Sequence, residues 1–139
     1  MAEYYTDFSF KLPLPQTTDE RLSKFLTGYS KSHNEEPGSF PGFEVGVVNE
    51  KHDKAIYVFS DNVRGELDEV AEFVRDFIEE FYPGEGKAVV ITWAEYCSKP
   101  RTGSFGGGAL IVTEEGVVDE VLPDLVAEDR IKKANLSQL

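Results

Sequence analysis

Residues 66–82 read ELDEVAEFVRDFIEEFY and form the clearest structural element in the sequence. Its apolar side chains recur at spacings of three and four, the period of an amphipathic α-helix. They are Leu67, Val70, Val74, Phe77, Ile78 and Phe81. Pro83 and Gly84 follow directly and predict the end of the helix. The pattern therefore predicts one long helix with a single buried stripe.

Strand patterns lie on both sides of this helix. Before it, residues 43–49 (FEVGVVN) and 55–60 (AIYVFS) are separated by a polar turn and predict a hairpin. After it, residues 87–97 (KAVVITWAEYC) begin with a continuous apolar run, which is typical of a central strand. Residues 109–113 (ALIVT) predict a further strand that pairs back onto it.

The first part of the chain predicts one more strand and one more helix. Residues 3–14 (EYYTDFSFKLPL) roughly alternate and end among prolines, which indicates a strand. Residues 18–31 begin with acids and then place apolar side chains three and four apart, which predicts a short amphipathic helix. Residues 32–42 (SHNEEPGSFPG) hold two prolines and two glycines and predict a loop.

The resulting order, β-α-β-β-α-β-β, predicts an α+β protein with an antiparallel sheet of about five strands and two helices on one face. This order fits a split β-α-β unit of ferredoxin-like type, and a generic antiparallel sheet with two helices is the alternative. Residues 1–122 are predicted to form a single α+β domain. Residues 123–139 are predicted to form a C-terminal helix opened by Pro123 or a frayed tail.

The charge balance of the chain argues against some classes of function. Its 139 residues carry 26 acids and 14 bases, a net charge of −12. A generic nucleic-acid-binding protein shows the reverse, because affinity for phosphate comes from lysine and arginine. Direct nucleic-acid binding and docking on an anionic membrane are therefore not expected. Two interpretations of the negative charge remain: it attracts a basic partner, or it only keeps the protein soluble through self-repulsion.

The sequence predicts a cytoplasmic protein. Its single cysteine, Cys97, cannot form an intramolecular disulfide, which is usual in reducing compartments. The first ten residues (MAEYYTDFSF) lack the basic and apolar regions of a signal peptide. No window approaches the length of apolar sequence that a membrane helix needs, so no membrane association is expected.

The outer face of helix 66–82 is the main candidate for a partner-binding site. This segment carries seven acids against Arg75 alone, a net charge of −6. Six of the acids lie opposite the apolar stripe: Asp68, Glu69, Glu72, Asp76, Glu79 and Glu80. Like charges at this spacing cost a few tenths of a kcal/mol per pair, and a row of one sign imitates a row of phosphates. The alternative is a solvated face whose first acids interact favourably with the helix dipole.

The loop predicted for residues 98–108 (SKPRTGSFGGG) is the second candidate. Glycines let backbone N–H groups converge on an anion, and neighbouring cations supply charge. The anion-binding residues would be Lys99, Arg101, Ser104, Gly106, Gly107 and Gly108. The pattern matches neither the P-loop nor the dinucleotide fingerprint. The other interpretation is a hairpin loop whose glycines allow a bulge or close packing of Phe105 and Trp93.

No catalytic residue, metal site or cofactor is predicted. Cys97 beside Lys99 and Arg101 would need a histidine base to act as a nucleophile. His33 lies in a predicted loop and His52 in a predicted turn, and no motif places either of them. An inert Cys97 is the better interpretation, and one cysteine with two separated histidines makes no zinc pattern.

Residues 93–101 (WAEYCSKPR), 105–109 (FGGGA) and Val112-Thr113 together resemble a signature in small uncharacterised proteins of phages and other mobile elements. The resemblance covers roughly residues 87–115, about a fifth of the chain. That family has no established activity, so the resemblance implies a type of source and nothing about chemistry. Acidic proteins encoded by phages are often inhibitors that occupy nucleic-acid-binding surfaces of host proteins. This analogy rests on the type of source and not on the residues of the chain.

These observations predict a non-enzymatic acidic binding protein of a phage or mobile element, which inhibits a basic host protein through helix 66–82. The alternative is a protein that binds a small anionic ligand or nucleotide with the loop from Lys99 to Gly108. A third interpretation is a homodimer formed by pairing of exposed sheet edges, with the functional surface at the junction.

Overall fold

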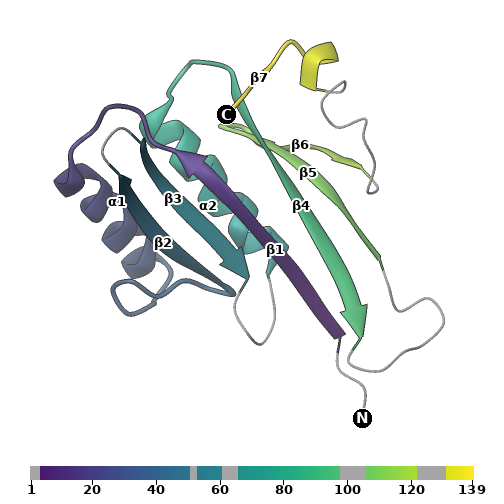
Figure 1. Ribbon diagram of the computed structural model, residues 1–139, viewed down its shortest axis with the longest axis horizontal. Helices are drawn as coiled ribbons and strands as arrows, with labels where there is room; N and C mark the ends of the chain where they lie inside the picture. The colour runs from purple at the N-terminus through teal and green to yellow at the C-terminus, as the bar shows by residue number, and fades with distance from the viewer. Residues whose placement is uncertain (1–3, 51–52, 61–65, 98–105, 122–130) are drawn as a thin grey trace.

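Two helices lie side by side on one face of a seven-stranded sheet (Figure 1). The computed structural model describes residues 4–50, 53–60, 66–97, 106–121 and 131–139. The strands are β1 (Tyr4–Pro13), β2 (Phe43–Glu50), β3 (Asp53–Ser60), β4 (Lys87–Cys97), β5 (Gly106–Thr113), β6 (Gly116–Val121) and β7 (Ser137–Gln138). The two long helices are α1 (Asp19–Ser32) and α2 (Leu67–Phe81). The predicted α+β class is confirmed, and both helices begin and end within one residue of their predicted bounds.

The strand order is β2-β3-β1-β4-β5-β6, and all of these neighbours are antiparallel. Strand β3 lies between β1 and β2, which is the order of a split β-α-β unit. The elements from β1 to β4 make up this unit, and β5 and β6 extend the sheet beyond β4. The sheet therefore has more strands than the five that the sequence predicts.

The sequence did not predict strand β6, and it predicted too late a start for β5. The loop predicted through residue 108 is wrong for Gly106, Gly107 and Gly108, which belong to β5 and pair with residues 93–95 of β4. Glycines have no side chains, so they give no apolar alternation from which a strand can be recognised. In β6, Val117 and Val118 are adjacent and both about half exposed, so this strand also lacks the alternation of a half-buried strand.

The main core fills the space between the helices and the sheet. Strand β4 turns Val89 and Ile91 toward the helices, and β5 contributes Leu110 and Val112 to the same cluster. The buried stripe of α2 contributes Val70, Val74, Phe77, Ile78 and Phe81, as the sequence predicts. Phe73 is also fully buried, because α1 packs beside α2 and covers a second side of that helix. Burial of each such side chain stabilises the fold by about 1.5–3 kcal/mol.

Residues around both ends of α1 define where this helix begins and ends. Thr18 caps its first turn, because its Oγ1 accepts a hydrogen bond of 3.1 Å from the backbone N–H of Arg21. At the other end, His33 is the C-cap, and Asn34 follows in the left-handed conformation with φ of +58°. The position of His33 beside α2 therefore follows from where α1 stops.

The C-terminal segment packs on the opposite face of the sheet. Ile131 is buried there against Ala88 of β4 and Ile111 of β5, and residues 131–133 are helical. Strand β7 pairs in parallel with the start of β4, and the N–H of Leu139 donates to Ala88 O at 2.9 Å. Residues 123–130 of the predicted terminal helix or tail lie outside the described residues.

Substitution of alanine for glycine should have opposite effects in β5 and in α1. Gly107 has φ of +149°, and a Cβ atom there would collide with Trp93 O. We expect Gly107→Ala to lower the free energy of unfolding by about 1–3 kcal/mol. A Cβ on Gly28 in α1 meets nothing within 4 Å, so Gly28→Ala should raise it by about 0.5–1 kcal/mol. Urea unfolding measures both, and equal stability of Gly107→Ala and the parent would contradict this account of β5.

Candidate functional site

The six acids predicted as a partner-binding face divide into two rows on α2. Glu69, Asp76 and Glu80, here called the inner row, lie on the side that α1 covers. Asp68 and Glu79, the outer row, lie on the side turned away from α1, and Glu72 lies between the rows. Helix periodicity gives this division, and the contacts of α1 with Glu69, Glu72 and Glu80 agree with it.

Internal ion pairs occupy three of these six acids. Glu80 Oε1 lies 3.2 Å from Arg21 Nε, and Glu72 Oε1 lies 3.3 Å from His33 Nε2. Asp76 Oδ1 lies 3.1 Å from Arg75 Nη2. The sequence predicted Arg75 as the opposing charge, but it did not predict the pairing with Arg21 and His33. The three acids that form no ion pair with described residues are Asp68, Glu69 and Glu79.

Arg21 joins the C-terminal part of α2 to the start of α1. Its Nη2 donates to the backbone oxygen of Glu80, and its guanidinium lies 5.0 Å from the centre of the Phe81 ring. A cleft of about 540 Å³ opens beside it, lined among others by Arg21, Lys24, Asp76 and Glu80. Charges of both signs therefore line this end of the helix pair, which makes it a poor match for a uniformly basic partner.

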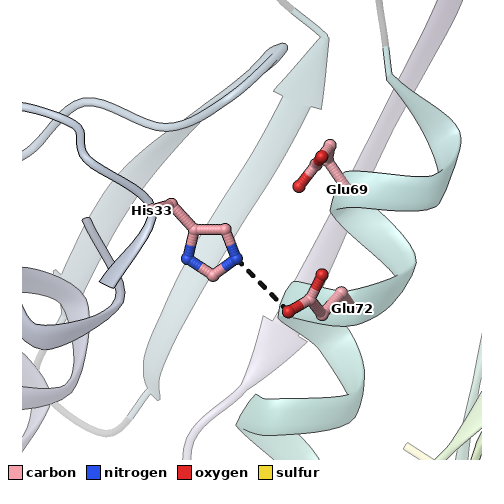
Figure 2. A group of neighbouring side chains, drawn as sticks. All are labelled: His33, Glu69 and Glu72. Atoms are coloured by element: carbon pink, nitrogen blue, oxygen red, sulfur yellow. Dashed lines mark hydrogen bonds and ion pairs between the residues drawn. The ribbon is translucent and has the colours of Figure 1, made fainter. Parts of the chain in front are cut away.

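The other end of the helix pair gathers one histidine and two carboxylates (Figure 2). His33 reaches across from the C-cap of α1, while Glu69 and Glu72 point toward it from successive turns of α2. One ligand atom from each of the three side chains lies within 4.8 Å of the other two. All three side chains are partly buried. The sequence did not predict this cluster, because His33 and Glu72 are 39 residues apart and no motif joins them.

Hydrogen bonds orient the His33 ring. Nδ1 lies 3.0 Å from Tyr29 O and 2.9 Å from Ser32 Oγ, and a proton on Nδ1 is donated to the Tyr29 carbonyl. The ring also stacks on Tyr29, with centroids 4.1 Å apart. Burial lowers the pKa of His33, but the hydrogen bond to Tyr29 and the interaction with Glu72 outweigh it and raise the pKa above its ordinary value. Nε2, the other ring nitrogen, faces the carboxylates.

The pKa of Tyr29 reflects its burial and an excess of negative charge around this cluster. Its ring is buried, and its hydroxyl donates to the backbone oxygen of Glu69 at 3.3 Å. Burial raises the pKa of Tyr29, and the charges of Glu72, Asp76 and Glu69 raise it further, while Arg75 opposes them. The internal ion pairs therefore leave a net negative potential between the helices.

The second predicted site lies largely outside the described residues. Lys99, Arg101 and Ser104 belong to that part of the chain, so the anion-binding interpretation stays a prediction. Gly107 and Gly108 pair with Ala94 and Trp93 as strand residues, which agrees with a structural use of these glycines. The backbone of Cys97 ends β4, and His52 is not among the described residues.

Ionisation of Tyr29 should destabilise the fold at high pH. Its pKa is raised in the folded state, so stability is complete below the unfolded value of about 10 and is lost as pH rises above it. A Tyr29→Phe variant cannot ionise at this position, and its stability should fall less steeply above pH 10, by about 1.4 kcal/mol per pH unit. Urea unfolding of both proteins at a series of alkaline pH values measures the slopes. Identical slopes would contradict the predicted environment of Tyr29.

Comparison of the chain with protein-family models, with curated proteins and with solved structures found no match. Neither of the long helices in the described part of the chain has the length and apolar character needed to cross a membrane. The candidate functional site therefore rests on the geometry and charge of this chain alone.

Proposed function

We propose that this chain is a non-enzymatic acidic binding protein, and that helix α2 engages a basic surface of another protein. The observation that carries the proposal is the outer row. Asp68 and Glu79 are exposed, and neither forms an ion pair with a described residue. A helix needing only stability would place lysines between such acids, because like charges on one face are unfavourable.

The arrangement of charge favours a partner that meets α2 from its outer side. Arg21 and His33 compensate Glu80 and Glu72 from the α1 side. The outer row has only Arg75 beside it on the helix, and this arginine is paired with Asp76. Burial and the charges of nearby acids of α2 raise the pKa of Tyr29, and the same acids add to the negative potential that attracts a cationic surface.

The spacing of the acids is compatible with a partner that normally binds phosphates. Asp68 and Glu72 are about 6 Å apart along the helix axis, and Glu72 and Glu79 about 10 Å apart. Phosphates of one strand are about 3.4 Å apart along the duplex axis, so these acids match the spacing of every second or third phosphate. Together with the resemblance of residues 93–113 to proteins of phages and mobile elements, this favours an inhibitor of a nucleic-acid-binding host protein. No observation on the described residues favours the alternative ligand site in residues 98–108.

Reversing the charges of the outer row should weaken binding to the partner. Capture from a host lysate at low salt, followed by affinity measurement with the purified partner, compares the parent with an Asp68→Lys/Glu79→Lys variant. We expect the variant to bind at least about tenfold more weakly, because it places like charges against a basic surface. Binding of the parent should weaken with salt, since exposed charges are screened within about 8 Å at physiological ionic strength.

The matched control is Glu36→Lys/Glu44→Lys, which changes the net charge equally at exposed acids that do not belong to α2. This variant should bind nearly as tightly as the parent. If both variants lose affinity equally, net charge rather than the face of α2 determines binding, and the proposal is wrong. Salt-independent binding by the parent would also contradict it. Urea unfolding of both variants verifies that the outer-row substitutions leave the fold intact.

A further inference from the structure

His33, Glu69 and Glu72 come from two helices and converge on one point (Figure 2). Imidazole nitrogen and carboxylate oxygen are the ligands that zinc and related divalent ions take in proteins. Glu69 and Glu72 are three residues apart, so they lie on the same side of α2, and the C-cap of α1 brings His33 opposite them. The fold thus assembles a ligand set that no stretch of the sequence contains.

The distances suit a metal ion with little rearrangement. Two ligands bound at about 2.1 Å in tetrahedral geometry are about 3.4 Å apart. His33 Nε2 and Glu72 Oε1 already lie 3.3 Å apart. The chosen oxygen of Glu69 lies within 4.8 Å of both atoms, and a rotation of its flexible side chain closes the remaining gap.

Hydrogen bonds orient the His33 ring as they do in metal-binding histidines, and a metal ion would replace the proton on Nε2. Metal-binding histidines usually donate their second ring N–H to a carbonyl or carboxylate, which orients the ring and fixes the tautomer. Here Nδ1 donates to Tyr29 O, and Ser32 Oγ also lies 2.9 Å from Nδ1. When Nδ1 donates to Tyr29 O, loss of the Nε2 proton leaves a lone pair that faces Glu72 and Glu69.

The local charge also favours a cation. Glu69 forms no ion pair with the described residues, and Glu72 is paired only with His33, whose charge requires a proton on Nε2. With His33 neutral, two neighbouring carboxylates of α2 face the imidazole without a compensating charge from it. The C-terminal end of α1 adds partial negative charge, which offsets the partial positive charge at the start of α2.

We propose that His33 Nε2 and the carboxylates of Glu69 and Glu72 bind a divalent transition-metal ion of the zinc class. The imidazole ligand selects against Mg²⁺ and Ca²⁺, which prefer oxygen ligands throughout. Three protein ligands leave at least one position for water. Because the ligands come from both helices, the bound ion ties the C-terminal end of α1 to the first two turns of α2. This proposal does not depend on a protein partner.

Titration of the full chain with ZnCl₂, followed by calorimetry, tests the site. The parent should bind one zinc ion, and an excess of Mg²⁺ should not displace it. His33→Asn and Glu72→Gln should each weaken binding by about tenfold or more, since even loss of a supporting residue around a metal site costs 10–100-fold. Glu69→Gln leaves the contact between His33 and Glu72 in place, so it provides a third test if either of the other variants is unstable.

Two controls separate this site from diffuse binding to an acidic protein. Glu79→Gln removes an acid of the same helix outside the cluster, and His52→Asn removes the other histidine of the sequence. Both should bind zinc as the parent does. In the parent, zinc should also shift the His33 imidazole resonances and raise the thermal unfolding temperature, and the rise in temperature should not survive in His33→Asn.

Zinc affinity that is unchanged in His33→Asn and Glu72→Gln would overturn the proposal. Equal loss in Glu79→Gln, or the absence of saturable binding by the parent, would also overturn it. The Asp68→Lys/Glu79→Lys variant used for the partner retains all three ligands. A failure of partner binding can therefore be distinguished from a failure of metal binding.

Discussion

The packing of aromatic rings around Phe73 is the constraint on which both candidate surfaces depend. Phe73 of α2 contacts Phe25 and Tyr29 of α1, with centroids 5.7 and 5.1 Å apart, and Phe43 of β2 at 5.2 Å. The ring of Tyr29 meets that of Phe73 almost at a right angle, an arrangement that the quadrupoles of the two rings favour. These contacts fix α1 against α2 and both helices against the sheet.

The polar contacts between the helices follow from this packing. Tyr29 presents its ring to Phe73 and its backbone oxygen to the His33 ring, so the residue that fixes the helix pair also orients the histidine. Burying one side of the Tyr29 ring leaves its hydroxyl next to Glu69, where a hydrogen bond to backbone satisfies it. The same arrangement places four carboxylates of α2 near α1, which has Arg21 and His33 to pair with two of them.

The sequence predicted what depends on local periodicity. The stripe from Leu67 to Phe81 predicted α2 almost residue by residue, because burial follows the helical period. The order of elements also predicted a split β-α-β unit, since short connections restrict the possible topologies. Strand β6 was missed because Val117 and Val118 do not alternate with polar residues, and the first residues of β5 because Gly106–Gly108 carry no side chains.

The sequence predicted the acidic face of α2 but not the groups that α1 brings to it, because those depend on tertiary structure. The acids of α2 share one helix, so their common face could be derived from spacing alone. Their division into two rows could not, since it depends on the side from which α1 approaches. His33 shows this most clearly: in the sequence it opens a polar stretch with no motif, whereas in the fold it caps α1 opposite Glu72.

The division of charge by α1 gives the two sides of α2 different chemistry. On the side facing α1, carboxylates are close to cations and hydrogen-bond donors of the same chain, in a partly buried setting where charges interact more strongly than in water. There, an added cation must compete with groups that the fold already supplies. On the outer side, Asp68 and Glu79 are exposed to solvent and screened by salt, so their attraction for a cation is short in range and weak for each pair. A small ion held by several ligands suits the first environment, and a broad basic surface that sums many weak attractions suits the second.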